Sequence, residues 1–85
     1  MAFYKIQFKQ SADKDIRKIE KSFIPAIIEK INRLSTDPFP SGVKKLMNTD
    51  NIYRLRVRDY RVIYQITEGR QITIHYIRHR KDAYR

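Results

Sequence analysis

The sequence contains no cysteine, only two glycines and no long run of apolar residues. Without cysteine, neither disulfides nor a thiolate metal site can support the fold, so hydrophobic burial must hold it together and a reducing cytoplasm is the expected compartment. No apolar stretch approaches the roughly 18 residues that a membrane span needs, and the N-terminus does not begin like an export signal. We therefore expect a soluble cytoplasmic protein that does not contact a membrane.

Residues for metal-dependent or nucleophilic catalysis are also scarce. His75 and His79 are the only histidines, and no carboxylates cluster with them at the spacing of metal ligands. There is no Gly-rich phosphate loop, and no serine has an identifiable partner to activate it. Any catalysis is therefore expected to need no metal and no other cofactor. His75 stands among Ile72, Ile74 and Ile77, which predicts a structural role for it.

Acidic residues are few. Nineteen Lys and Arg stand against nine Asp and Glu, a formal charge of +10 that is most easily explained by a polyanionic partner. Residues 51–85 carry nine of the cations and only three acids, and eight of these nine cations are arginine. Because guanidinium groups bind phosphate in a planar, two-pronged geometry, this half of the chain is predicted to hold a nucleic-acid site.

The hydrophobic periodicity changes along the chain from that of a strand to that of helices and back again. Tyr4, Ile6 and Phe8 alternate with polar residues, Ser11 is expected to cap the first helix, and Pro25 suits the first turn of the second. The expected elements are a strand at 3–8, helices at 11–23 and 25–34, a loop at 39–51, and strands at 52–58, 60–67 and 71–77.

This β-α-α-β-β-β order predicts an α+β fold in a single domain of residues 1–85. We expect an N-terminal strand, a helix hairpin that covers one face of the sheet, and a three-stranded antiparallel meander over residues 52–78. Leu55 and Val57 alternate with Arg54, Arg56 and Arg58, so the uncovered face should present arginines. Four strand tyrosines are expected to pack in the core: Tyr53, Tyr60, Tyr64 and Tyr76.

Composition and periodicity predict only a basic α+β nucleic-acid-binding domain, but three motifs add to this. They are Tyr53-Arg54-Leu55-Arg56, Tyr60-Arg61-Val62-Ile63-Tyr64 and Arg78-His79-Arg80-Lys81-Asp82-Ala83-Tyr84. Taken in this order, together with the chain length and the β-α-α-β-β-β element order, they resemble the RelE-like toxins of type II toxin–antitoxin systems, mRNA interferases of the RelE/ParE superfamily, and the match spans nearly the whole chain.

The resemblance implies a metal-free endoribonuclease that enters the ribosomal A site, cuts the mRNA there by attack of a ribose 2′-hydroxyl, and so inhibits translation. Arg61 and Arg78 would stabilise phosphate charge, and Tyr84 would transfer a proton. Arg54 and Arg56 would bind RNA and support the transition state. Arg80 would give electrostatic support.

The resemblance leaves the proton-transfer group open between two residues. An unperturbed tyrosine has a pKa near 10, so Tyr84 needs the surrounding arginines to favour its phenolate. An unperturbed histidine has a pKa near 6.5, which makes His79 the chemically simpler acid or base. Familiar RelE enzymes carry lysine where this chain has Arg54 and Arg56. Arginine stays protonated, so these two are assigned electrostatic roles. Arg58 is the arginine most readily explained as a solvated surface residue.

The resemblance also implies binding partners, and two alternative functions compete with the nuclease interpretation. The partners would be the ribosome with its mRNA and a cognate RelB-like antitoxin that covers the basic face. One rival is a ParE-like toxin that inhibits gyrase without nuclease activity, since one small fold can host both functions. The other rival is a non-catalytic basic module that binds ribosomal RNA.

Overall fold

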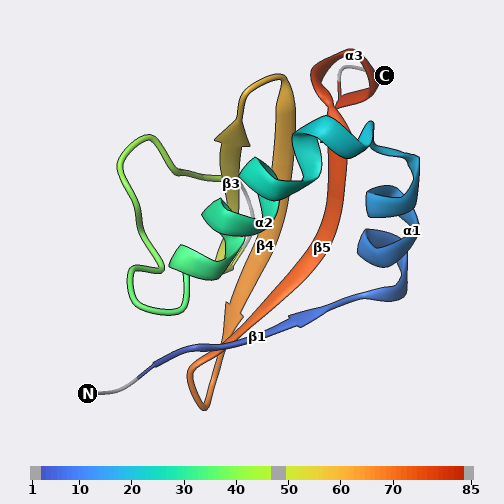
Figure 1. Cartoon of the computed structure of the whole chain (residues 1–85). Helices are drawn as coiled ribbons and strands as arrows, with labels where there is room; N and C mark the ends of the chain where they lie inside the picture. The colour runs from blue at the N-terminus through green and yellow to red at the C-terminus, as the bar shows by residue number, and fades with distance from the viewer. Residues whose placement is uncertain (1–2, 47–49, 84–85) are drawn as a thin grey trace.

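The computed structural model describes residues 3–46 and 50–83, which form a mixed sheet with helices on one face (Figure 1). In chain order the elements are β1 (Lys5–Phe8), α1 (Gln10–Lys18), the 3₁₀ turn η1 (Lys21–Phe23), α2 (Ile24–Arg33), β2 (Lys44–Lys45), β3 (Ile52–Val57), β4 (Tyr60–Thr67), β5 (Gln71–His79) and α3 (Arg80–Ala83). The predicted α+β fold is confirmed. No helix within the described ranges is long and apolar enough to cross a membrane.

The sheet has the strand order β1-β5-β4-β3-β2. The predicted meander is confirmed, because β3 pairs with β4 and β4 with β5, both antiparallel. The N-terminal strand β1 joins the outer edge of β5 in a parallel arrangement. The strand β2 was not expected, since residues 39–51 were predicted as a loop. Its two residues Lys44 and Lys45 pair with Arg54 and Tyr53, and two residues are too few to leave a periodic pattern.

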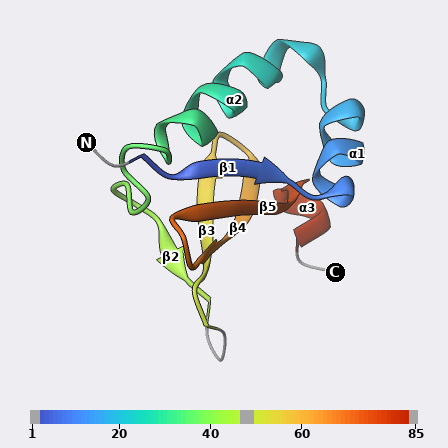
Figure 2. The ribbon, with the colours of Figure 1, turned by 90° about the horizontal axis from the view of Figure 1, so that it is seen from below.

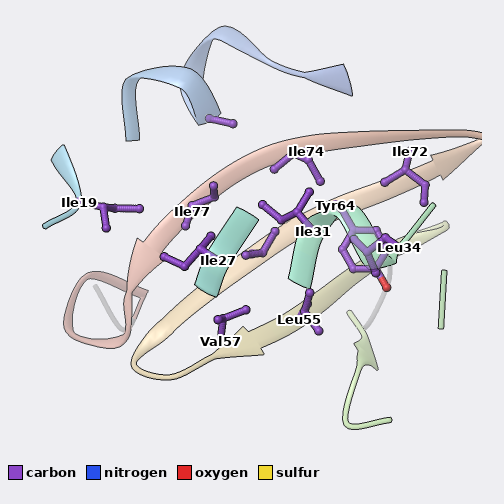
Figure 3. Packing of buried hydrophobic residues seen from close by; sticks show 12 residues of the cluster. Ile19, Ile27, Ile31, Leu34, Leu55, Val57, Tyr64, Ile72, Ile74 and Ile77 are labelled. Atoms are coloured by element: carbon purple, nitrogen blue, oxygen red, sulfur yellow. The ribbon is translucent and has the colours of Figure 1, made fainter. Parts of the chain in front are cut away.

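Both long helices lie on the same side of the sheet (Figures 1 and 2), with α1 against β5 and α2 against β3. The spacing of Ile27, Ile31 and Leu34 places their side chains on one face of α2 and its C-terminal cap, and all three are buried. Figure 3 shows them between α2 and the strands. The strand residues that complete the core are Leu55, Val57, Val62, Tyr64, Ile72, Ile74 and Ile77.

The side chains of α1 complete the edge of β5 beyond the end of β1. The β1 pairing stops at Phe8 with Ile74. Further along, the hydroxyl of Ser11 donates to the carbonyl of His75, and Oδ2 of Asp15 accepts the N–H of Ile77 at 2.9 Å. The prediction that Ser11 caps the helix is therefore wrong, because α1 begins at Gln10 and the hydroxyl satisfies a strand carbonyl instead.

Tyr64 is the largest fully buried side chain of the core. Its hydroxyl donates to the carbonyl of Pro38 at 2.7 Å, and its ring stacks on Tyr53 with centroids 5.7 Å apart. The ring of Phe39 packs edge-on against the ring of Tyr53, with centroids 5.2 Å apart. As predicted, Tyr53, Tyr60 and Tyr64 pack in or against the core. Loss of water around the phenol raises the pKa of Tyr64 in the folded chain.

The Tyr64→Phe substitution should have a pH-dependent cost. Near pH 7 it should lower the free energy of unfolding by about 1 kcal/mol, through loss of the hydrogen bond to Pro38. Because the folded-state pKa of Tyr64 is raised, its protonated form stabilises the fold fully below the unfolded value of about 10, and this contribution is lost as the pH rises further. The difference from wild type in urea unfolding should therefore shrink above about pH 10. A difference that stays constant across this range would contradict the buried phenol.

Candidate nucleic-acid interface

The strand register brings together three arginines that are distant in the sequence. Arg56 of β3 lies opposite Arg61 of β4, and Arg61 lies opposite Arg78 of β5. Directly opposite residues in an antiparallel ladder point to the same face, with Cβ atoms about 4.5–5.5 Å apart. The neighbouring residues Val57, Val62 and Ile77 point into the core, so these arginines point away from the helices. We call the three residues the arginine row, and this side of the sheet the arginine face.

A second row lies beside the first. Arg54, Ile63 and Tyr76 are opposite one another across β3, β4 and β5, and Lys44 of β2 pairs with Arg54. The guanidinium carbon of Arg78 lies 4.5 Å from the centroid of the Tyr76 ring, a cation–π contact between the two rows. The arginine face thus carries an aromatic ring among its cations.

The position of Tyr76 corrects a prediction, since we expected this residue in the core. Simple alternation from Ile72 and Ile74 places residue 76 inside and residue 77 outside. The register between β4 and β5 shifts between Ile63 and Tyr64, so that Tyr76 pairs with Ile63 and Ile74 with Tyr64. This bulge reverses the alternation, which turns Tyr76 to the arginine face and buries Ile77.

Within the described strands, no carboxylate side chain accompanies these cations. The described strands contain Lys and Arg but neither Asp nor Glu, and the described acids lie in helices, turns and loops. Glu29 of α2 forms an ion pair with Arg33, 2.8 Å apart, and both residues line a cleft beside β3 together with Arg56 and Arg58. Like charges directly opposite one another across strands destabilise a sheet. Opposed arginines that destabilise the sheet in this way are expected where a site binds an anionic ligand.

The remaining predicted arginines lie at the end of the sheet where α3 begins. Arg58 stands in the two-residue turn between β3 and β4 at a φ of +56°, and its carbonyl accepts Nε of Arg56 at 3.4 Å. The backbone N–H of Arg80 donates to the carbonyl of Asp59 in the same turn, at 2.7 Å. This hydrogen bond holds the start of α3 beside the arginine row. Tyr84 lies outside the described residues.

His79 lies on the other face of the sheet. It pairs with Tyr60, and the two rings meet edge-on with centroids 5.3 Å apart. Its Nδ1 accepts the backbone N–H of Lys81 at 3.2 Å. With Asp15 and Lys18 it lines a cleft of about 500 Å³ between α1 and the end of β5. The structure therefore brings Arg54, Arg56, Arg61 and Arg78 together on one face and turns the side chain of His79 to the opposite face, although Arg78 also lines the cleft beside His79.

Metal ligands do not gather among the residues that the structure describes, where no group of three or more His, Asp or Glu is placed to hold an ion. His75 is on the arginine face, where its Nε2 lies 2.9 Å from Oε1 of Gln65. Burial lowers the pKa of His75, and the nearby charge of Lys9 lowers it further. The imidazole is therefore uncharged near neutral pH.

Comparison with known proteins identifies the family. The model of the ParE toxins of type II toxin–antitoxin systems, parDE, matches residues 6–84. The chain belongs to the RelE/ParE superfamily of toxins. The toxin is 29% identical to the putative toxin RelE1 of Methanocaldococcus jannaschii in an alignment of 86 positions that covers 96% of each chain.

Solved structures agree with this assignment. The toxin is similar to a chain of the archaeal RelE–RelB complex from Pyrococcus horikoshii, with a TM-score of 0.79 and 28% identity over 91% of this chain and 94% of that one. It shares its fold with the isolated RelE toxin of E. coli, with a TM-score of 0.78 and 19% identity over 95% of each chain. It is thus a RelE-like toxin of a type II toxin–antitoxin system.

Proposed function

We propose that this toxin is a ribosome-dependent endoribonuclease that cuts mRNA in the ribosomal A site without a metal ion. The observation that carries the proposal is the arginine row, in which Arg56, Arg61 and Arg78 lie side by side across three strands. Fixed cations on one rigid sheet can stabilise the negative charge that builds up on a phosphate as its ester bond is exchanged. The described strands contribute no carboxylate side chain of their own to this positive field.

The proposed reaction needs no external nucleophile. The 2′-oxygen of a ribose attacks the adjacent phosphorus as it loses its proton to a base, and the bond from phosphorus to the 5′-oxygen of the next nucleotide breaks. The leaving oxygen takes a proton from an acid, which yields a 2′,3′-cyclic phosphate and a 5′-hydroxyl. Arg61 and Arg78 stabilise the phosphate in this reaction. Arg54 and Arg56 bind the flanking RNA, and Arg80 adds positive charge beside the row.

We assign proton transfer to Tyr84. It follows α3, whose first residue is held beside the arginine row by the hydrogen bond of Arg80 to Asp59. Several guanidinium groups near a phenol favour its phenolate, the form that accepts a proton. His79 is across the sheet from the row, so we assign it a positioning role. Its contacts with Tyr60 and the N–H of Lys81 fix the segment that leads to Tyr84.

The proposed partners follow from the same surface. The ribosome and its mRNA are polyanions that a face rich in arginine binds through phosphate contacts, in the cytoplasm where translation occurs. The similar archaeal structure is a RelE–RelB complex, which supports a RelB-like antitoxin as the regulator of this toxin. We propose that an acidic or amphipathic segment of that antitoxin covers the arginine face. Its binding should weaken as salt is raised.

A second candidate function is inhibition of gyrase, which the match to the parDE family model favours. Two assays with the same purified toxin separate the candidates. Messenger RNA is incubated alone and on programmed ribosomes, and plasmid DNA is incubated with gyrase. We expect cleavage on ribosomes only, at toxin concentrations that leave supercoiling unchanged. Loss of supercoiling without RNA cleavage would assign the toxin to gyrase. Ribosome binding with neither effect would make it a non-catalytic RNA-binding module.

A further inference from the structure

The arginine face continues into a region of uncharged hydrogen-bonding side chains. Gln65 of β4 lies opposite Thr73 of β5, and Thr73 lies opposite Gln7 of β1. Nε2 of Gln7 donates to Oγ1 of Thr73 at 3.0 Å, so both side chains lie on the same face. Gln65 is four residues beyond Arg61 on the same strand, about 13 Å at 3.3 Å per residue. We call Gln7, Gln65, Thr73 and His75 the polar row.

The bulge adds His75 to this row. His75 has no opposite residue in β4, because Tyr76 pairs with Ile63 and Ile74 with Tyr64. The extra residue turns both His75 and Tyr76 to the arginine face, a common use of a bulge beside a functional site. Since the imidazole is uncharged, Nε2 donates to Oε1 of Gln65 and Nδ1 is left as an acceptor.

The two rows suit different parts of a nucleic acid. Guanidinium groups bind phosphate, which is the same in every nucleotide and therefore fixes position without reading sequence. Amides, a hydroxyl and a neutral imidazole offer the donors and acceptors that match the edge of a base in single-stranded RNA. Tyr76 lies between the rows and follows His75 in the chain. One strand of RNA lying across β4 and β5 would therefore meet phosphate-binding and base-matching groups in succession.

We propose that the polar row reads a base of the RNA, near the phosphate that the arginine row holds, and so sets the nucleotide preference of the toxin. The inference rests on the proposed function for its choice of RNA as the ligand. It assigns specificity to Gln7 and Gln65, which the sequence motifs do not include. Removing their amides should reduce the difference in affinity between bases, while the contribution of phosphate contacts to affinity stays the same.

The test is binding of short 2′-O-methyl oligomers of A, C or U, which cannot be cut by 2′-hydroxyl attack. Wild-type affinities should differ by about 10-fold between the best and the worst base. In Gln7→Leu or Gln65→Leu the difference should fall to about 2-fold, with an unchanged salt dependence. Arg56→Ala should weaken all three oligomers by a similar factor and reduce the salt dependence. The matched control is Asn32→Leu, which removes an exposed amide from α2 on the other side of the sheet.

Equal wild-type affinities for the three oligomers would overturn the inference, and so would undiminished discrimination in both glutamine variants. Gln7 is exposed, so its substitution leaves the core intact and keeps the test valid if Gln65→Leu fails to fold. The binding assay involves no cleavage. Failure of the nuclease proposal would therefore appear in the ribosomal cleavage assay and not in the binding assay. Cleavage by a toxin that binds all three oligomers equally would overturn only the role of the polar row in base preference.

Discussion

Substitution of Arg61 by alanine should reduce single-turnover cleavage of ribosome-bound mRNA by about 10²–10³-fold. Arg61 is the central member of the arginine row, between Arg56 and Arg78, so its charge lies closest to any phosphate that the row as a whole can hold. A fixed cation directed at the developing charge of a transition state contributes far more than the same charge in water. The measurement is the cleavage rate at saturating toxin on programmed ribosomes.

The matched control for this experiment is Arg17→Ala. It removes the same charge from an exposed position on α1, on the other side of the sheet, and should change the rate by only about 2-fold. Arg61→Lys should fall between wild type and alanine, because lysine keeps the charge but loses the two-pronged geometry. Equal losses in Arg61→Ala and Arg17→Ala would show that net charge, and not the row, determines the rate.

Substitution of Tyr84 by phenylalanine should reduce the cleavage rate by about 10²–10⁴-fold, the usual contribution of a group that transfers a proton in the transition state. Only the hydroxyl is removed, so ribosome binding should stay within about 2-fold of wild type, since phosphate contacts supply the affinity. The measurement is the single-turnover rate as a function of pH, together with the dissociation constant for ribosomes. If Tyr84 is the group that accepts the proton, wild type should show a rise in rate with pH that the variant lacks.

His79→Gln is the comparison for Tyr84→Phe. The geometry places His79 across the sheet from the arginine row, where it contacts Tyr60 and the backbone of Lys81. If His79 only positions the segment before Tyr84, His79→Gln should have a lower cleavage rate but a pH profile of the same shape as wild type. If His79→Gln instead abolishes the pH dependence while Tyr84→Phe retains it, the roles of the two residues must be exchanged.

The sequence predicts which face of the sheet a strand residue points to better than it predicts which residues lie opposite one another on neighbouring strands. The alternation of Arg54 and Arg56 with Leu55 and Val57 correctly predicts a basic face, because a strand turns successive side chains to opposite sides. The arginine row requires in addition the register of β3, β4 and β5, which depends on long-range pairing that no local pattern contains. Arg56, Arg61 and Arg78 belong to three separate sequence motifs. Only the strand register shows that they form one site.

The bulge explains the largest error in the sequence-based account. One extra residue in β5 moves Tyr76 from the expected core position to the arginine face, and it turns His75 toward Gln65. No turn residue marks this point, since the segment from Gln71 to His79 reads as one uninterrupted strand. The polar row was missed for a related reason. Gln7 and Gln65 are ordinary strand residues in the sequence, and their common face emerges only from the parallel pairing of β1 with β5.

The proposed chemistry is tested most directly by an mRNA that carries a single 2′-deoxynucleotide on the 5′ side of the mapped cut, placed in the A site of programmed ribosomes. If the ribose 2′-hydroxyl is the nucleophile, the toxin should cut the all-ribose message, leave a 5′-hydroxyl on the downstream fragment, and not cut the deoxy message at that position. Equal cleavage of both messages, or no cleavage of either, would contradict the assignment of the arginine row to this reaction.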